Sequence, residues 1–347
     1  MSFARLVVDL DSVSANYRRF VEASAGLAGA VVKADAYGLG MEAVARRLKT
    51  EGCEHFFVAT PDEGFALRSV INEGAVYVFS GPPDADTAMA FTLANIVPVL
   101  NSREQIGLWK RQNGAPAALQ VDTGMQRLGF DPKELAPTLL EGIELVLLMS
   151  HLACADEPQH PQNEKQVDVF SRVCEDFPGI ETSFGNSAGT LNGTQYQGGI
   201  TRPGIGLYGG NPYLDKANDF RNAAVFEAQV VQRRRVNAGE SVGYGATYVA
   251  PRNIEIAIVG VGYADGVSRV LSGKGQLAHN GARLSVLGQI GMDLIHVDVT
   301  DDPSIAVGDW LEVIGATVTL DEVAEMTGTS GYEILSRIGS RVSRVYV

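Results

Sequence analysis

The sequence predicts an α/β fold, in which a (β/α)8 TIM barrel is followed by a C-terminal, mainly β domain. Over about the first 210 residues, short apolar runs alternate with amphipathic stretches of helical period, a pattern typical of parallel strands joined by helices. After about residue 222, strand-like runs separated by Gly, Asn and Asp replace this pattern. Such a change within a chain of 347 residues indicates a second domain.

Eight apolar runs supply the predicted barrel strands. They fall at residues 29–34, 55–60, 75–80, 96–100, 117–122, 144–150, 181–186 and 199–207. Helical stretches such as MEAVARRLKTE and EKQVDVFSRVCEDF separate most of them, and the weakest connection is a short piece that begins at Ser187. Eight strands over about 180 residues favour a closed barrel, compact beside the roughly 250 residues typical of one. An open doubly wound sheet is the competing architecture.

A ninth run near the N-terminus, RLVVDL, is assigned outside the barrel. In the C-terminal part, five runs are strand-like: FEAQVVQRRRV, IEIAIVGVGY, ARLSVLGQ, DLIHVDV and DWLEVIG. Only TLDEVAEMTG and GYEILSRIG look helical. The polar, turn-rich stretch NPYLDKANDFRN marks the expected boundary, which gives a barrel of residues 11–220 and a β domain of residues 221–347.

Composition and charge restrict the function classes. Hydrophobic residues make up 45% of the chain and charged residues 20%, as in an ordinary soluble globular protein. A net charge of −13 without a basic stripe argues against nucleic acid and anionic membranes as partners. The N-terminal apolar run is too short for a signal peptide, and no run is long enough to span a membrane. Three cysteines without CxxC spacing indicate reduced thiols in a cytoplasmic protein.

Five polar residues lie at or near the ends of predicted strands. Lys33 ends the first strand, Arg127 follows the fifth, His151 ends the sixth, Ser187 follows the seventh and Arg202 sits in the eighth. The carboxyl-terminal ends of barrel strands share one face, and active sites of (β/α)8 barrels lie there. These five side chains are therefore expected to converge on one mouth.

Each candidate residue also has a purely structural interpretation. A lysine at a strand end is usually solvated, and Arg202 before a proline can simply pair with a carboxylate. The spacing of His151 and Cys154 resembles half a zinc site, but the other histidines lack a partner pattern, so no metal site is predicted. Met292 by default fills a core, and Tyr244, flanked by glycines, is typical of a strand aromatic beside a bulge.

Taken together, the strand-end residues favour a phosphorylated cofactor. Ser187 at a helix start, with the backbone of the RPGI stretch, offers a phosphate site, although the chain has no Walker loop. A strand-end lysine beside such a site can hold an aldehyde through an imine. Pyridoxal 5'-phosphate has both groups, and its ring acts as an electron sink.

The stretch VVKADAYGLG around Lys33 closely resembles the lysine motif of bacterial alanine racemases, which are pyridoxal-phosphate enzymes of fold type III. The stretches VDTGMQRLGF, NSAGT, TRPGIGLYG, GYGATY, GYADG and IGMD recur in the order this family shows, so the resemblance covers nearly the whole chain. It implies a barrel, a β domain that includes an N-terminal strand within residues 1–10, and a head-to-tail homodimer. In such a dimer the β domain contributes to the partner's active site.

The resemblance also implies which residues hold the cofactor. Lys33 would carry it as an internal aldimine, Arg202 would face the pyridine nitrogen and His151 would lie beside the ring. The phosphate would be bound by Tyr37, Ser187, Tyr332 and the backbone of Gly204 and Ile205. Because an arginine stays charged, it should keep the ring nitrogen unprotonated. That predicts less quinonoid build-up and fewer side reactions such as transamination.

Racemisation needs two bases on opposite faces of the α-carbon. By resemblance, Lys33 would serve the D side once substrate displaces it from the imine, and Tyr244 from the other subunit would serve the L side. Their ordinary pKa values of about 10.4 and 10 lie well above neutral, so nearby cations and desolvation must ease their ionisation.

The remaining implied roles concern the substrate. Arg127 would contact the phenolic oxygen of the cofactor and the substrate carboxylate. Met292, also from the other subunit, would meet that carboxylate through its backbone amide. Tyr263 and Asp293 would line the pocket and its approach.

Three departures from the family pattern affect rate and specificity. Gln120 stands where many members have a lysine, often carbamylated, and is expected to orient Arg127 through a neutral amide instead. Gln289 and Gly291 replace the usual arginine and a Cys or Ser in the GQIGMD stretch, which removes a charge and bulk near the entrance. Ser183 stands where many relatives place a histidine that supports the ring arginine.

The expected function is therefore that of an alanine racemase, an isomerase that interconverts L- and D-alanine and supplies D-alanine for peptidoglycan. Another small amino acid such as serine is an alternative substrate. A non-catalytic pyridoxal-phosphate-binding protein is a second alternative, but such proteins are generally a lone barrel. A fold-related decarboxylase is a third, and it should have a longer chain and a cysteine base in a different motif.

Overall fold

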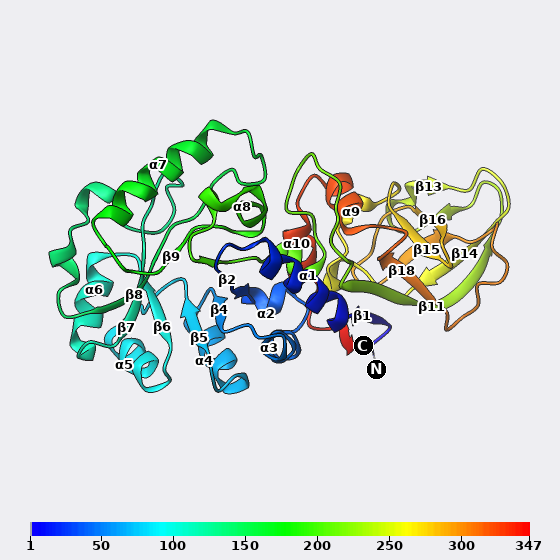
Figure 1. The fold of residues 1–347 in the computed structure, drawn as a ribbon. Helices are drawn as coiled ribbons and strands as arrows, with labels where there is room; N and C mark the ends of the chain where they lie inside the picture. Colours follow the sequence, from blue (N-terminus) through cyan, green and yellow to red (C-terminus); the bar gives the residue numbers. More distant parts are fainter. Residues whose placement is uncertain (1) are drawn as a thin grey trace.

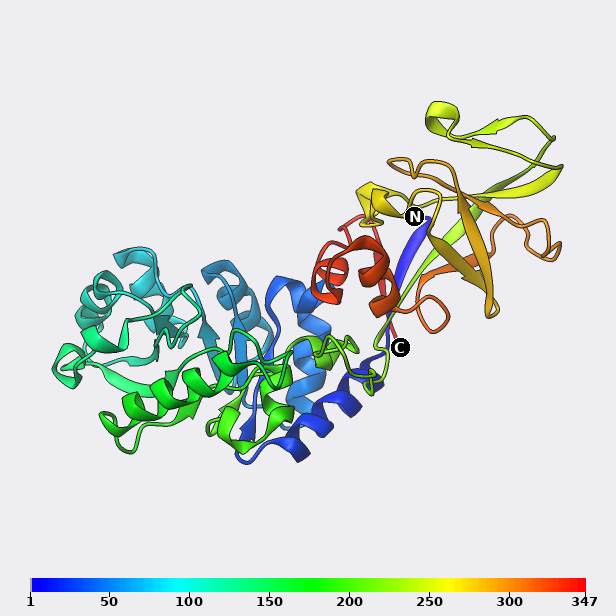
Figure 2. The same cartoon turned by 90° about the horizontal axis from the view of Figure 1, so that it is seen from above.

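The structure, a computed structural model, describes residues 2–347 and has two lobes (Figure 1). One lobe holds the parallel strands and their helices, and the other holds most of the later β strands. Seen from above, the second lobe extends away from the first and ends in a hairpin of β12 (Ser241–Val242) and β13 (Tyr248–Val249) (Figure 2). The chain is therefore elongated, with this hairpin at the end remote from the barrel.

Seven parallel strands form one sheet in chain order, as alternating strands and helices predict. They are β3 (Ala30–Val31), β4 (His55–Val58), β5 (Ala75–Val78), β6 (Val97–Leu100), β7 (Pro116–Gln120), β8 (Glu144–Met149) and β9 (Thr182–Ser183). The eighth position is β10 (Ile200–Thr201), which pairs in parallel with β2 (Leu27–Ala28), directly before β3. The Arg202 N–H donates to the Gly185 carbonyl at 2.7 Å, which links β10 back to the chain after β9. Each predicted run overlaps one of these eight positions, and the predicted fold class is confirmed.

Helices connect most of the strands. They are α1 (Leu10–Ala23), α2 (Lys33–Tyr37), α3 (Met41–Thr50), α4 (Pro61–Val70), α5 (Ala85–Leu93), α6 (Arg103–Trp109), α7 (Pro161–Glu175) and α8 (Ser187–Asn192). A capping box of Thr60 and Glu63 begins α4. The connection after β7 contains only short 3-10 turns at Pro132–Glu134 and Pro137–Leu140, because a proline is tolerated only in the first turn of a helix.

The second lobe is built on a closed ring of strands. Its members are β11 (Ala224–Val236), β14 (Ile254–Val259), β15 (Gln276–His279), β16 (Ala282–Leu287), β17 (Ile295–Asp298) and β18 (Trp310–Ile314). The long strand β11 pairs with β18 near its start and with β14 near its end, and irregularities in its register accompany the change of partner. This double pairing closes the six strands into a small antiparallel barrel.

Two strands from the ends of the chain extend this sheet. The N-terminal β1 (Ala4–Val8) pairs antiparallel with β11 and parallel with the C-terminal β19 (Ser343–Tyr346). The run RLVVDL thus lies outside the first barrel, as predicted. The short strands β12, β13, β15 and β19 had no counterpart among the predicted runs, because their few residues show no clear alternation.

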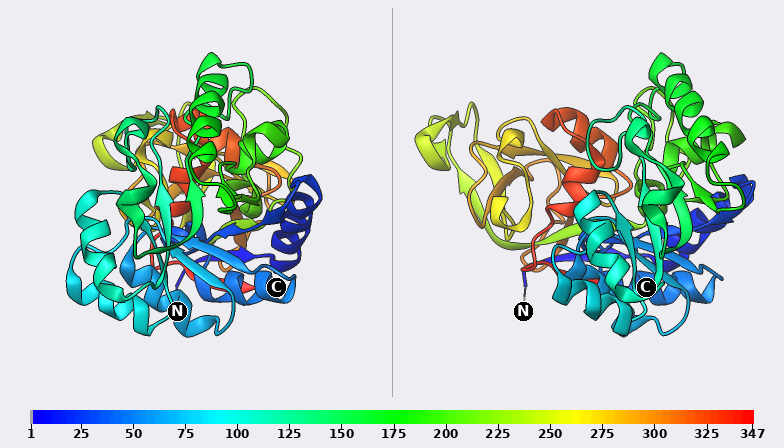
Figure 3. Two further views of the ribbon diagram at one scale, coloured as in Figure 1. Left: turned by 60° about the vertical axis from the view of Figure 1, so that its left-hand side comes forward. Right: turned by 90° about the vertical axis from the view of Figure 1, so that its left-hand side faces the viewer.

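The last two helices lie at the junction of the lobes. These are α9 (Leu320–Thr327) and α10 (Gly331–Ser336), and α10 contacts α2 of the first barrel (Figures 1 and 3). Most buried apolar side chains of the two lobes form one continuous core, and a smaller separate cluster that includes Val242 and Ile254 lies in the second lobe. Within residues 2–347, no helix combines the length and apolar character that crossing a membrane requires.

Candidate active site

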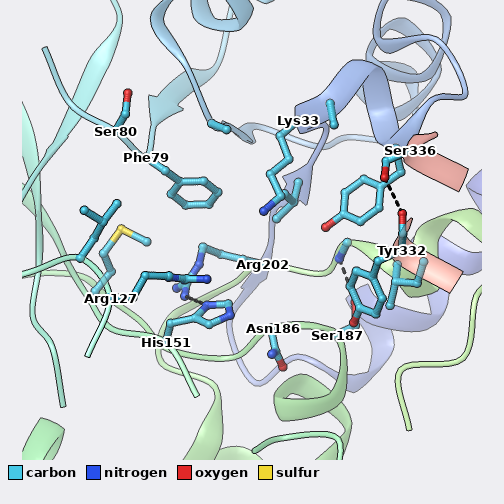
Figure 4. A pocket seen from close by; sticks show the side chains of 18 of the residues that line it. Lys33, Phe79, Ser80, Arg127, His151, Asn186, Ser187, Arg202, Tyr332 and Ser336 are labelled. Atoms are coloured by element: carbon cyan, nitrogen blue, oxygen red, sulfur yellow. Dashed lines mark hydrogen bonds between the residues drawn. The ribbon is translucent and has the colours of Figure 1, made fainter. Parts of the chain in front are cut away.

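A cavity of about 730 Å³ opens at the carboxyl-terminal ends of the first barrel's strands. Its wall contains residues that follow β3, β5, β8 and β9, and α10 of the second lobe covers one side (Figure 4). Among the predicted site residues, those that line it are Lys33, Tyr37, Arg127, His151, Ser187, Arg202, Gly204, Ile205 and Tyr332. The polar residues at the strand ends therefore do share one mouth.

Lys33 projects its amine into the middle of this cavity, about 6.0 Å from the centre of the Phe79 ring (Figure 4). Burial, and then the Arg127 guanidinium, lower the pKa of Lys33, while the Glu63 carboxylate acts in the opposite direction. A lysine with a lowered pKa holds a larger share of the free amine that attacks a carbonyl. The interpretation of Lys33 as an ordinary solvated lysine is therefore wrong.

The four residues after Lys33 form a left-handed turn. Ala34, Asp35, Ala36 and Tyr37 all have φ between 50° and 56°. This conformation costs roughly 1–2 kcal/mol per residue that is not glycine, so surrounding contacts must hold it. Within the turn, the Gly38 N–H donates to the Ala34 carbonyl at 2.8 Å, and the Asp35 side chain accepts from the Met41 N–H at 2.7 Å. The turn places the ring of Tyr37 6.0 Å from that of Tyr332.

One end of the cavity presents hydroxyl and backbone N–H groups. The Ser187 hydroxyl accepts from the Gly204 N–H at 2.8 Å and from the Gly206 N–H at 3.5 Å. A Cβ at Gly204 would lie only 2.5 Å from the Tyr37 hydroxyl, so a glycine is required for this close approach. The Tyr332 ring lies beside Ser187 (Figure 4). This end, here called the hydroxyl corner (Tyr37, Ser187, Gly204, Ile205, Tyr332), offers neutral donors to an anion.

Arg202 is the buried cation of the site, with 2% of its surface exposed. Its guanidinium donates to the Ser183 hydroxyl, to the Ser150 carbonyl at 2.5 Å and to the Phe184 carbonyl at 3.4 Å. All of these acceptors are neutral. Burial, and then Arg127, lower the pKa of Arg202 to about 9, which still leaves it charged at neutral pH. Ser183 thus supports Arg202 at the position where the family resemblance places a histidine in many relatives.

His151 lies against Arg202, with its Nδ1 3.4 Å from a guanidinium nitrogen. Burial, and then Arg202, Arg127 and Lys33, hold the pKa of His151 well below its usual range. The imidazole is therefore neutral at physiological pH. It forms a flat, uncharged wall of the cavity near Lys33 (Figure 4).

Arg127 stands on a loop that Asp122 organises. The Asp122 carboxylate accepts from the N–H groups of four residues at 2.8–3.1 Å: Gly124, Met125, Gln126 and Arg127. Burial raises the pKa of Asp122, but these four hydrogen bonds outweigh it and the net shift is downward. The Gln120 amide donates to the Val121 carbonyl at 3.4 Å. Asp122 shapes the loop backbone that carries Arg127, and the orientation of the Arg127 side chain by Gln120 stays a prediction.

The other four predicted site residues do not line the cavity of their own chain. Tyr244 is 73% exposed in the turn between β12 and β13, and Met292 is 52% exposed, so the core interpretation of Met292 is wrong. Tyr263 donates its N–H to the Gly291 carbonyl at 3.1 Å, which joins its turn to the Met292 segment. Asp293 forms an ion pair of 2.8 Å with Arg341. These residues form one exposed surface of the second lobe.

Several wall residues were absent from the prediction. Phe79, Ser80 and Asn101 line the side of the cavity at the ends of β5 and β6. The Asn101 side-chain oxygen is buried and has no hydrogen-bond partner within the described part of the chain. The same rule that selected Lys33 and His151, a polar residue at a strand end, would have found Ser80 and Asn101.

Comparisons with known proteins agree with this geometry. A family model for the alanine racemase N-terminal domain matches residues 8–212, and one for the alanine racemase C-terminal domain matches residues 223–346. The chain is 43% identical to a catabolic alanine racemase of Rhizobium johnstonii over 98% of this chain and 94% of the relative. It is 41% identical to an alanine racemase of Rhodospirillum rubrum over 99% of this chain and 96% of the relative.

A solved structure shows the same likeness. The alanine racemase of Bartonella henselae, crystallised with covalently bound pyridoxal phosphate, superposes with a TM-score of 0.93 at 37% identity. The match covers 99% of both chains. Family models over nearly the whole length and relatives above 40% identity lead to one conclusion: this chain belongs to the alanine racemase family.

Proposed function

We propose that this protein is an amino-acid racemase that interconverts L-alanine and D-alanine with pyridoxal 5'-phosphate as its cofactor. The observation that carries the proposal is the position of Lys33, whose amine of lowered pKa shares one cavity with Arg202 and the hydroxyl corner. The names of the relatives and the covalently bound cofactor of the Bartonella henselae enzyme support the same activity.

The donor set of the cavity fits this cofactor at three points. Lys33 offers an amine to the aldehyde, and Arg202 offers a cation to the pyridine nitrogen. Ser187, Tyr37, Tyr332 and the backbone of Gly204 and Ile205 offer neutral donors to the phosphate. The imidazole of His151 would lie against the ring, and burial and then the surrounding cations keep its pKa low and the imidazole uncharged.

When bound, pyridoxal phosphate supplies an electron sink that makes the α-proton of an amino acid easier to remove. The residues of this chain then have to move the proton. Burial and then Arg127 favour a free amine on Lys33, which we propose accepts and returns the proton on the D side. Arg202 stays charged among neutral partners, and beside a bound pyridine ring it would leave the ring nitrogen without a proton.

The base on the L side is proposed to be Tyr244 of a second copy, so that the working unit is a homodimer with shared sites. Tyr244 is largely exposed in the turn between β12 and β13, and this hairpin lies at the end of the second lobe remote from the first barrel (Figure 2). An exposed tyrosine flanked by Gly243 and Gly245, near the exposed Met292 and Tyr263, is typical of an interface rather than of a free surface.

Substrate recognition follows from the same dimer. Arg127 of the first copy and the backbone amide of Met292 from the second would bind the carboxylate of the amino acid. Tyr263 and Asp293 would line the approach, and the ion pair between Asp293 and Arg341 would hold that rim in place. We further propose that residues 11–220 and residues 221–347 with strand 1–10 are the two domains, and that the enzyme supplies D-alanine for peptidoglycan in the cytoplasm.

The decisive experiment is chiral analysis of alanine after incubation of L-alanine with the purified protein and pyridoxal phosphate. The wild type should produce D-alanine, and Lys33→Ala should lose activity while it keeps the melting temperature of the cofactor-free wild type. Lys274→Ala, at an exposed lysine of the second lobe, is the matched control and should retain full activity. Turnover by Lys33→Ala, or no D-alanine from the wild type, would reject the proposal.

A further inference from the structure

The Glu63 carboxylate on α4 makes three hydrogen bonds near Lys33. One oxygen accepts from the Thr60 N–H at 3.2 Å and from the Ala59 N–H at 2.7 Å, and the other accepts from the Ala34 N–H at 2.7 Å. Only the bond to Thr60 belongs to the capping box of α4. The other two join the end of β4 to the residue directly after Lys33.

The bond to Ala34 lies at the start of the left-handed turn, where the backbone needs support. Four successive residues with positive φ, none of them glycine, persist only if outside contacts determine their conformation. Arg344 supplies such a contact at the far end, because its guanidinium donates twice to the Gly38 carbonyl, at 3.0 and 2.9 Å. Glu63 is the contact at the near end.

Glu63 also acts on the amine of Lys33 through its charge. Among the groups that shift the pKa of Lys33, Glu63 opposes burial and Arg127 and favours the charged form. Arg344 at the far end of the turn is not among those groups. Glu63 and Arg344 therefore differ in their roles. Both hold the backbone of the turn through hydrogen bonds, but of the two only Glu63 shifts the pKa of the Lys33 amine.

We infer that Glu63 is a positioning residue for Lys33, which both fixes the left-handed turn that carries the lysine and balances the positive charge of Arg127 beside the amine. The inference rests on the proposed function, since it concerns the amine that captures the cofactor. Glu63 does not touch the reacting atoms itself. It acts through the Ala34 N–H and through its charge.

The test follows capture of pyridoxal phosphate by the full-length protein after its own cofactor has been removed with hydroxylamine and dialysis. Only the free amine attacks an aldehyde, so the capture rate rises with pH. Its midpoint reports the ionisation of Lys33, and its plateau at high pH reports how well the lysine is placed. Absorbance follows the reaction, and borohydride reduction with peptide mapping verifies that Lys33 is the site.

Different variants separate charge from geometry. Glu63→Gln should move the midpoint to lower pH, because the charge that favours the ammonium is gone, and should lower the plateau several-fold. Glu63→Asp keeps the charge but is too short to span three N–H groups, so its plateau should fall with little change of midpoint. Arg344→Gln should likewise lower only the plateau. Asp62→Asn, an exposed acid next to Glu63 on α4, is the matched control and should behave as wild type.

Two results would overturn the inference. One is a folded Glu63→Gln protein whose capture rate has the wild-type midpoint. The other is a Glu63→Asp protein whose capture rate reaches the wild-type plateau. The second result tests the inference even if Glu63→Gln does not fold. Failure of the wild type to capture the cofactor at Lys33 would reject the proposed function instead. The two hypotheses are thus tested by different measurements in one experiment.

Discussion

At the scale of single residues, three cations, Lys33, Arg127 and Arg202, face one cavity. Burial is the largest cause of the lowered pKa values of Lys33, Arg202 and His151; beyond it, Arg127 lowers those of Lys33 and Arg202, and all three cations lower that of His151. Their mutual repulsion favours an anionic ligand, which a phosphorylated cofactor and an amino-acid carboxylate both provide. Ser183 fits this arrangement, because a neutral hydroxyl supports Arg202 without adding a fourth positive charge.

The lowered pKa of His151 predicts how stability depends on pH. In the unfolded chain this histidine binds a proton below about pH 6.5, whereas in the folded chain it stays neutral to a much lower pH. The unfolded state therefore binds more protons in this window, and the free energy of unfolding falls as pH drops below about 6.5, by about 1.4 kcal/mol for each unit between the two pKa values.

His151→Asn should remove this contribution. Urea unfolding of the cofactor-free protein at several pH values between 8 and 5 measures the free energy for both proteins. The wild type should lose more stability than the variant as the pH falls from about 6.5 to 5, and the two curves should run parallel above pH 7. Parallel curves over the whole range would mean that His151 takes up a proton in the folded protein.

At the scale of secondary structure, the element labelled α2 decides where the reactive lysine points. A right-handed helix after β3 would carry Tyr37 away from Gly204, whereas the left-handed turn brings its hydroxyl to the glycine that has no Cβ. Glu63 of α4 accepts a hydrogen bond from Ala34, and Arg344 of β19 donates hydrogen bonds to Gly38. Two different parts of the chain therefore stabilise one strained turn.

The strain of the turn predicts that an alanine-to-glycine substitution changes the free energy of unfolding in opposite directions at two positions. Ala34 has φ of 50° and is exposed, so Ala34→Gly relieves the left-handed backbone and should raise the free energy of unfolding by roughly 0.5–1 kcal/mol. Ala66, exposed in the right-handed helix α4, is the control. Ala66→Gly should lower the free energy by about 1 kcal/mol. A decrease at both positions would contradict the claim that the turn is strained.

At the scale of the whole molecule, hydrophobic period predicted the first barrel and most of the second lobe, because each parallel strand and its helix form a local pattern. It could not predict that β11 pairs with both β14 and β18, since closure of that ring depends on partners far apart in the chain. Residues such as Lys33 and His151 were predictable, because active sites of (β/α)8 barrels lie at the carboxyl-terminal ends of the strands. The contact of Glu63 with Ala34 was not, because it joins a helix to a turn whose handedness the sequence pattern does not encode.

The most informative property of the whole molecule is that Lys33 lines the cavity of the first barrel, whereas Tyr244 does not line it and lies in the turn between β12 and β13. That hairpin lies remote from the first barrel (Figure 2). If Tyr244 serves the cavity of a second copy, Lys33→Ala and Tyr244→Phe chains should each be inactive alone, with kcat reduced about 10²-fold or more. A mixed dimer of the two has one complete site, because the cavity of the Tyr244→Phe chain receives Tyr244 from its Lys33→Ala partner.

When equal amounts of the Lys33→Ala and Tyr244→Phe chains exchange subunits at random, half of the dimers are mixed. Each mixed dimer has one of its two sites intact. The mixture should therefore recover about a quarter of the wild-type kcat, as expected for a symmetric dimer with sites shared between chains. Refolding the two variants together, or passing differently tagged chains over two affinity columns, prepares the mixed dimer for a coupled D-alanine assay. Because neither parent has a complete site, recovered activity can only come from sites built by two chains. A mixed dimer that stays inactive would mean that Tyr244 is not the base lent between subunits.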